Sequence, residues 1–204
     1  MIAVLNYGMG NVSSIKNMLI KAGEHNVKLV DKPDGLMKAD KIILPGVGSF
    51  DMGMRLLENS GMREELDRQV QENKKPILGI CLGMQMLGKG SEEGKEEGLG
   101  YLDFRCQKFV MEDDSFKIPH IGWDYVYSMK DNPLILNLGS RPRFYFVHSY
   151  HVVCENEEDI LLKCDYGYEF AAAIQKGNIY GTQFHPEKSH IFGMNLMRNF
   201  IREI

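Results

Sequence analysis

The sequence has few cysteines, no long apolar run and no excess of positive charge. Its four cysteines, Cys81, Cys106, Cys154 and Cys164, show no C-x-x-C spacing, which argues against a zinc ribbon, a thioredoxin-like site and a disulfide framework. No apolar stretch approaches the roughly 18 residues that a membrane span needs. The net charge of −4 argues against a general nucleic-acid surface. We therefore expect no metal, membrane or nucleic acid as a partner.

The size and composition are those of an ordinary globular protein. The chain has 204 residues, of which 44% are hydrophobic and 25% are charged. This length suits one domain spanning 1–204, and no linker or internal repeat divides it. No basic segment followed by a long apolar one opens the sequence, so we expect a cytoplasmic protein with reduced cysteines.

Strands and helices alternate over the first 88 residues. We expect strands at 2–6, 27–30 and 41–44 and directly behind Pro76, and helices at 12–22, 50–59, 62–73 and 82–87. Such alternation predicts an α/β fold with an open, mainly parallel sheet flanked by helices. The carboxyl ends of its strands share one edge, where ligands usually bind.

The second half is rich in short strand patterns. After a polar, glycine-rich stretch at 88–100, which reads as a mobile surface loop, we expect six strands and a final helix at 189–203. The expected strands are 104–110, 117–127, 144–154, 160–164, 170–175 and 179–183. They should extend the sheet with antiparallel pairs.

The pattern Gly79-Ile80-Cys81-Leu82-Gly83 lies where a buried strand turns abruptly into a helix. Such a turn strains the backbone of its apex residue, and the flanking glycines allow close backbone approach, as in the nucleophile elbow of hydrolases. The thiol then lies at a helix N-terminus, where the helix dipole favours negative charge. On this motif alone, Cys81 is equally a nucleophile or a buried core cysteine.

Two further segments favour the nucleophile. Gly46-Val47-Gly48 follows a strand, and backbone N–H groups in such a loop can stabilise an oxyanion. His185-Pro186-Glu187 follows the last strand, where the proline fixes a turn on which the carboxylate can hold the imidazole. Cys81, His185 and Glu187 therefore form a candidate nucleophile, base and orienting acid for acyl transfer through a thioester.

The motifs Gly79-Ile-Cys81-Leu-Gly-Met-Gln85 and Gln183-Phe-His185-Pro-Glu187 resemble those of the class I (triad) glutamine amidotransferases, whose sheet is flavodoxin-like. Within that family, further motifs are similar to those of the glutaminase subunits of imidazole glycerol phosphate synthase. These motifs are Tyr7-Gly-Met-Gly-Asn11, Pro45-Gly-Val-Gly48, Lys117-Ile-Pro-His-Ile-Gly-Trp123, Phe144-Tyr-Phe-Val-His-Ser-Tyr150 and His185-Pro-Glu-Lys-Ser189.

The resemblance implies that the chain hydrolyses L-glutamine without a cofactor. Cys81 would attack the side-chain amide, and His185 and Glu187 would complete the triad. The remaining implied roles fall into two groups. The oxyanion hole would be the Leu82 N–H and the Gly46–Val47 peptide, and the glutamine contacts would be Gly48, Gln85, Glu93, His148, Ser149 and Tyr150. Glu93 would bind the α-ammonium group, and the segment 148–150 the α-carboxylate.

The resemblance also implies a partner. Ammonia would pass to a (βα)8-barrel cyclase subunit that makes imidazole glycerol phosphate in histidine biosynthesis. Asn11, Trp123, Tyr145 and Lys188 match positions near that interface or its gate. The other histidines imply no metal site, because His148 and His151 should face opposite sides of one strand.

Two alternatives remain open from the sequence. A paralogous glutaminase subunit could deliver ammonia to a cyclase-like partner that amidinates a surface-polysaccharide sugar. The motifs leave this open because none of them recognises the molecule that accepts the ammonia. A non-catalytic redox-sensing protein would need the Cys81 thiol but neither Glu187 nor the glycine loop. A cysteine peptidase would share the triad, but the small polar site expected for glutamine argues against it.

Overall fold

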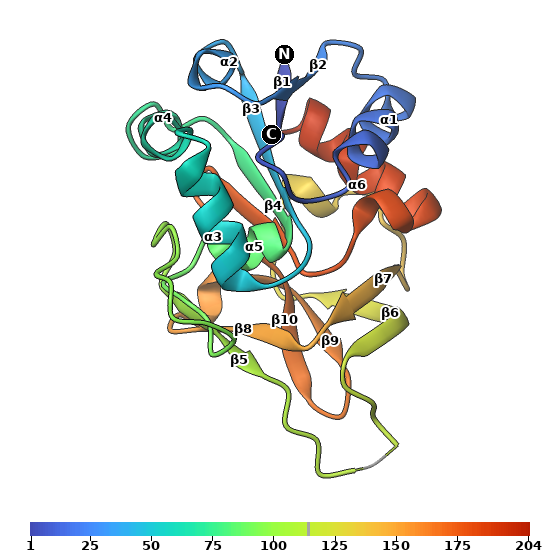
Figure 1. The fold of residues 1–204 in the computed structure, drawn as a ribbon. Coiled ribbons are helices and arrows are strands. Elements are labelled where there is room, and N and C mark those ends of the chain that lie inside the picture. Colours follow the sequence, from blue (N-terminus) through green and yellow to red (C-terminus); the bar gives the residue numbers. More distant parts are fainter. Residues whose placement is uncertain (114) are drawn as a thin grey trace.

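The computed structural model describes residues 1–113 and 115–204. The described part contains eleven strands. They are β1 (Ile2–Leu5), β2 (Val27–Val30), β3 (Lys41–Gly46), β4 (Ile77–Cys81), β5 (Phe104–Lys108), β6 (His120–Ser128), β7 (Arg143–His148), β8 (Tyr150–Cys154), β9 (Ile160–Asp165), β10 (Glu169–Lys176) and β11 (Ile179–Thr182). Their order in the sheet is β2–β1–β3–β4–β11–β10–β9–β6–β7, and β5 and β8 join it through β10 (Figure 1).

The sheet changes character across β11. The pairs from β2 to β11 are parallel, and the pairs from β11 to β7 are antiparallel. This is the mixed sheet that the sequence predicts, with antiparallel additions in the C-terminal half. The parallel part brings the carboxyl ends of β3, β4 and β11 to one edge.

Helices cover both faces of the parallel part. They are α1 (Val12–Ala22), α2 (Pro33–Met37), α3 (Phe50–Asn59), α4 (Arg63–Asp67), α5 (Leu82–Met86) and α6 (His190–Arg202). Asn11 caps α1 by accepting a hydrogen bond from the Ser14 N–H, and Gly23 ends the helix with a φ of +109°. In the described residues, no helix is long and apolar enough to cross a membrane.

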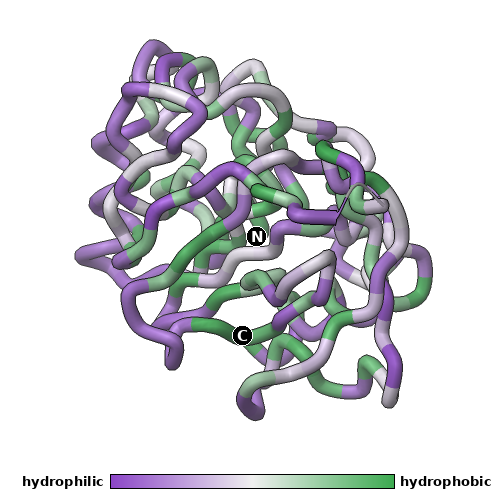
Figure 2. Tube along the Cα trace, turned by 90° about the horizontal axis from the view of Figure 1, so that it is seen from below, coloured by the Kyte–Doolittle hydropathy of each residue, from purple (hydrophilic) through white to green (hydrophobic). Residues whose placement is uncertain are grey.

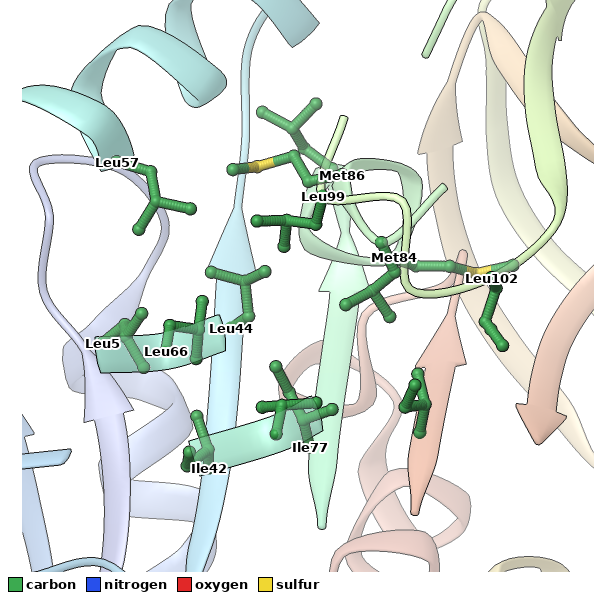
Figure 3. Close-up of a cluster of buried hydrophobic side chains, with 14 of the residues drawn as sticks. Leu5, Ile42, Leu44, Leu57, Leu66, Ile77, Met84, Met86, Leu99 and Leu102 are labelled. Carbon is green, nitrogen blue, oxygen red and sulfur yellow. The ribbon is translucent and has the colours of Figure 1, made fainter. Parts of the chain in front are cut away.

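Alternating strand residues divide the core into two clusters. Leu5, Ile42 and Leu44 pack on one face with residues of α3, α4 and α5, and Figure 3 shows this cluster. Val4 and Ile43 pack on the other face with residues of α1 and α6. In Figure 2, many of the outer turns are hydrophilic, whereas hydrophobic stretches run through the interior. Burial on both faces explains why the inner parallel strands β1 and β4 are continuous apolar runs.

Two expected elements are divided in the structure. The helix expected at 62–73 is α4 followed by a π-helical turn, η1, at Arg68–Glu72. The strand expected at 144–154 breaks at Ser149 into β7, which pairs with β6, and β8, which pairs with β5 and β10. Periodicity along the sequence does not reveal such a change of partner.

The segment at 88–100 is more closely packed than its composition suggests. Ser91 and Leu99 are buried, and bridges join Gly90 to Glu97 and Ser91 to Cys106. The Asp51 carboxylate of α3 accepts hydrogen bonds from the backbone N–H groups of the loop, and these bonds lower its pKa. The expected surface loop is thus anchored to α3.

Candidate active site

Cys81 stands at the junction of β4 and α5, at the carboxyl edge of the sheet. Its backbone has φ +54° and ψ −110°, a strained conformation for a residue with a side chain. A Cβ on Gly83 would lie 1.9 Å from the Leu44 carbonyl oxygen, and one on Gly79 would lie 2.6 Å from the Gly83 carbonyl oxygen. The elbow geometry predicted from the glycine spacing is therefore confirmed, and it places the thiol at the sheet edge, where Cys81 is 7% exposed.

The end of β3 lies directly beside this elbow. Gly46 pairs in register with Cys81, and a Cβ on Gly46 would lie 2.7 Å from the Gly83 backbone nitrogen. Gly48 follows with a φ of +97°, which favours glycine. The glycine loop and the nucleophile elbow thus share one small region of backbone.

His185 follows β11 and begins the short 3-10 turn η4 (Pro186–Lys188). Its Nδ1 lies 2.8 Å from Glu187 Oε1, as the turn predicts, and both side chains are almost fully buried. Ser189 fixes the turn, because its Oγ donates to the His185 carbonyl and accepts from the Tyr145 N–H. Among the described residues, His185 Nε2 has no hydrogen-bond partner, so this nitrogen is free for the reacting groups.

A cavity of about 300 Å³ opens at Cys81 and His185. Ten of the residues predicted for catalysis, the oxyanion hole or glutamine binding line it. These are Val47, Gly48, Cys81, Leu82, Gln85, Glu93, His148, Ser149, Tyr150 and His185, and Pro119 and Val147 complete the lining. Gly46 lies beneath the lining against Leu82, and Glu187 lies behind His185.

A family model for the class-I glutamine amidotransferases matches residues 3–204. The chain belongs to the class-I glutamine amidotransferase family. Two relatives match over nearly their whole length. The imidazole glycerol phosphate synthase subunit HisH 2 of Methanococcus maripaludis is 52% identical over 203 residues and covers 100% of both chains. The subunit of the same name from Pseudomonas aeruginosa is 48% identical over 201 residues and covers 98% of each.

Solved structures agree in fold. A crystal structure of a glutamine amidotransferase superposes with a TM-score of 0.73 at 21% identity, covering 98% of this chain and 96% of the other. The structure of PurLQS from Thermotoga maritima gives 0.72 at 22% identity, covering 99% and 97%. The family and fold inferred from the sequence motifs are therefore confirmed.

In this glutamine amidotransferase, helix α3 holds Glu93, the residue predicted to bind the α-ammonium group, in place. Glu93 Oε2 accepts a hydrogen bond of 2.8 Å from the Phe50 N–H, at the first residue of that helix. The Glu93 side chain also lines the cavity. The anchored loop thus brings a negative charge to a cavity that would receive a cationic group.

The predicted interface residues divide into two places. Trp123 and Tyr145 pair across β6 and β7 with ring centroids 6.1 Å apart, and Lys188 Nζ lies 5.6 Å from the Tyr145 ring centroid. Asn11 lies at the start of α1, where it caps that helix. Three of the four residues are therefore brought into contact by the fold.

Polar residues that sequence reasoning did not assign also reach the site. Gln183 is fully buried, and its Nε2 lies 3.8 Å from Cys81 Sγ. Its Oε1 accepts from Gln85 Nε2 at 3.1 Å. A polar residue directly after the last strand, two positions before His185, was the available signal.

The orientation expected for two histidines was wrong. Both His148 and His151 contact the Phe109 ring, with centroids at 5.2 and 4.6 Å, because the strand breaks between them. In the described residues, no three or more His, Cys, Asp and Glu side chains gather in a group that could hold a metal ion.

The His185 imidazole has an unusually high affinity for a proton. Burial lowers its pKa, but the interaction with Cys81 and the hydrogen bond with Glu187 outweigh burial and raise the pKa to about 9. At neutral pH the imidazole therefore holds a proton that it can donate to a leaving group.

We expect NMR titration of the His185 ring to show loss of its proton near pH 9 in the wild-type protein. In Cys81→Ala the pKa should fall, because the largest interaction that raises it is gone while burial still lowers it. His151, whose pKa burial lowers, serves as the internal control and should not respond. An unchanged His185 pKa in the variant would show that Cys81 does not interact with the imidazole.

Proposed function

We propose that this chain is the glutaminase subunit of imidazole glycerol phosphate synthase. It hydrolyses L-glutamine to glutamate and ammonia, in one domain spanning 1–204, and passes the ammonia to a cyclase subunit. The observation that carries the chemistry is the meeting of Cys81 and His185 at one cavity, with Glu187 hydrogen-bonded to the far side of the imidazole. The full-length identity to subunits with this name supports the pathway.

The proposed reaction has two halves. Cys81 Sγ attacks the amide carbon of glutamine, the carbon–nitrogen bond breaks, and His185 gives its proton to the departing ammonia. Water then attacks the thioester carbon, and His185 takes up a proton from that water. The carbon–sulfur bond breaks, which releases glutamate and returns Cys81 Sγ and the protonated His185. Glu187 stays ionised and orients the imidazole through Nδ1.

The backbone supplies the stabilisation of charge. In both halves, negative charge develops on the substrate oxygen next to the elbow. The Leu82 N–H and the Gly46–Val47 peptide are the proposed donors, and the register of Gly46 with Cys81 supports this assignment. An oxyanion hole built from main chain needs no side chain in a cavity this small.

The substrate is placed by groups around the cavity. We assign Glu93 to the α-ammonium of glutamine, the segment 148–150 to the α-carboxylate, and Gly48 and Gln85 to the body of the substrate. The support is that all of them line the same cavity as Cys81. A carboxylate for the ammonium gives the charge complementarity that such a ligand needs.

The partner is a (βα)8-barrel cyclase, and we place its interface over Trp123, Tyr145, Lys188 and Asn11. Trp123 is 37% exposed, which is high for a large aromatic ring. Tyr145 also joins this surface to the triad, because its carbonyl accepts from the His185 N–H at 2.9 Å. A contact on Tyr145 can therefore reach His185 through one hydrogen bond.

A second candidate is a paralogous subunit that feeds a cyclase-like partner for amidination of a surface-polysaccharide sugar. The relatives from Methanococcus maripaludis and Pseudomonas aeruginosa are both named HisH 2, and such numbering fits organisms with more than one copy. The glutaminase chemistry is the same in both candidates, and only the acceptor differs.

Mixing the chain with a histidine-pathway cyclase and its ribonucleotide substrate should separate the candidates. We expect glutamine-dependent formation of imidazole glycerol phosphate, and weak glutamine hydrolysis by the chain alone. The same cyclase supplied with ammonium salt is the control for competence. A competent cyclase that makes no product from glutamine with this chain would favour the sugar-amidinating paralogue.

A further inference from the structure

The side chains of Asp124, His120 and His148 are joined by hydrogen-bonding contacts beside the cavity, and we call this series of contacts the polar chain. His120 is fully buried and pairs in register with His148, as the first residue of β6 and the last residue of β7. His120 Nε2 lies 2.7 Å from Asp124 Oδ2, and His120 Nδ1 lies 3.1 Å from His148 Nε2. His148 Nδ1 lies 2.9 Å from the Tyr150 carbonyl oxygen. The polar chain therefore has three contacts, with the Asp124 carboxylate at one end and the Tyr150 carbonyl at the other.

Counting protons shows what these contacts require. Each contact needs one hydrogen between its two atoms, so the polar chain needs three protons. A carboxylate and a carbonyl supply none, and two neutral imidazoles supply two. With only two protons, one pair of atoms would face each other with lone pairs at hydrogen-bonding distance. The geometry thus calls for one proton more than two neutral histidines carry.

The surroundings locate that extra proton. Burial lowers the pKa of His148 to about 3, so His148 is the neutral member of the pair. Burial lowers the pKa of His120 on balance, and the hydrogen bond and charge of the Asp124 carboxylate offset it only in part, so the extra proton is held in the short contact between His120 and Asp124. A proton shared by His120 and Asp124 leaves this pair without net charge, and the Asp124 side chain is 37% exposed, so the desolvation cost is limited.

The Tyr150 end of the polar chain is connected to the sulfur of Cys81 through two side-chain amides. The Tyr150 carbonyl that faces His148 also accepts from Gln85 Nε2 at 3.0 Å. Gln85 Nε2 lies 3.1 Å from Gln183 Oε1, and Gln183 Nε2 lies 3.8 Å from Cys81 Sγ. The Tyr150 carbonyl is therefore the junction between the histidine pair and the amides at the nucleophile.

We propose that Asp124, His120 and His148 are positioning residues that hold three protons in three contacts, so that His148 Nδ1 donates to the Tyr150 carbonyl. Donation fixes that carbonyl and, through it, the Gln85 and Gln183 amides beside Cys81. The catalytic consequence rests on the proposed glutaminase function, whereas the protonation pattern does not.

The protonation pattern is tested by 15N NMR of the histidine side chains in the free protein at neutral pH. We expect His148 to carry its proton on Nδ1, with Nε2 accepting from His120. In Asp124→Asn the amide can donate to His120 Nε2, so two neutral imidazoles now satisfy all three contacts and His148 Nδ1 should remain protonated. A His148 Nδ1 without a proton in the wild-type protein would overturn the proposal.

The positioning role is tested by comparing two buried histidines replaced by phenylalanine. His120→Phe keeps a ring where His120 stacks on Tyr166, with centroids 3.9 Å apart. It removes the two ring nitrogens at the centre of the polar chain. His151→Phe is the matched control, because His151 also packs on the Phe109 ring but lies outside the polar chain. Its Nε2 lies 3.0 Å from Tyr168 Oη.

In the complex with the cyclase, we expect His120→Phe to raise KM for glutamine about tenfold, because His148 Nε2 is left buried without a donor. His151→Phe should change KM by less than about twofold. Equal effects in the two variants would mean that only loss of a buried polar ring matters, and would overturn the positioning role. If His120→Phe does not fold, the NMR measurement still decides the protonation pattern. If no variant, wild type included, hydrolyses glutamine with any cyclase, the proposed function fails while the NMR result stands.

Discussion

Replacing Cys81 by alanine should abolish glutamine hydrolysis in the complex with the cyclase. Removal of the nucleophile prevents formation of the thioester, and losses of this kind are at least about 10⁴-fold. The readout is glutamate released per minute at saturating glutamine, together with mass spectrometry after exposure to a glutamine-like alkylating analogue. Wild-type protein should gain one adduct at Cys81, and the variant none.

Cys164→Ala is the matched control for this experiment. Cys164 is also a buried cysteine, but it lies on β9 and does not line the cavity. We expect its turnover and labelling to match wild type. If Cys81→Ala kept its turnover in the complex, the assignment of the nucleophile would be wrong. Failure of the analogue to label an otherwise reactive Cys81 would instead favour the redox-sensing alternative.

Replacing Gly83 by alanine should remove both stability and activity. The new Cβ would lie 1.9 Å from the Leu44 carbonyl oxygen and 2.8 Å from its carbonyl carbon, and these are backbone atoms of a central strand. Because β3 and the elbow must separate, we expect the free energy of unfolding to fall by about 3 kcal/mol or more. Glutaminase activity should be lost with it, since the shift moves the Leu82 N–H away from the oxyanion position.

Gly100→Ala is the control for the backbone effect of adding a methyl group. Gly100 has a φ of +68°, and its Cβ would meet nothing within 4 Å. Only the left-handed conformation is penalised, which costs about 1–2 kcal/mol. Urea unfolding of the two variants measures the difference. A loss in Gly83→Ala no greater than in Gly100→Ala would contradict the close packing of the elbow.

The sequence by itself determined the local chemistry. A strand followed by Gly79, Cys81 and Gly83 predicts a tight strand-to-helix turn, because glycines at these two positions allow the close backbone approach that such a turn needs. The His185-Pro186-Glu187 turn likewise determines its own hydrogen bond, since both partners lie two residues apart on a rigid proline turn. Alternation of strands and helices was enough for the parallel half of the sheet.

The tertiary structure alone decided several contacts between distant residues. The break at Ser149 assigns β7 and β8 to different neighbours, and no periodicity encodes it. As a result, His148 pairs with His120, and the Tyr150 carbonyl faces Gln85. Such contacts depend on strand register and on the packing of side chains from several elements, which are properties of the assembled sheet. The sequence thus specifies the reactive groups, and the fold specifies the polar contacts that position them.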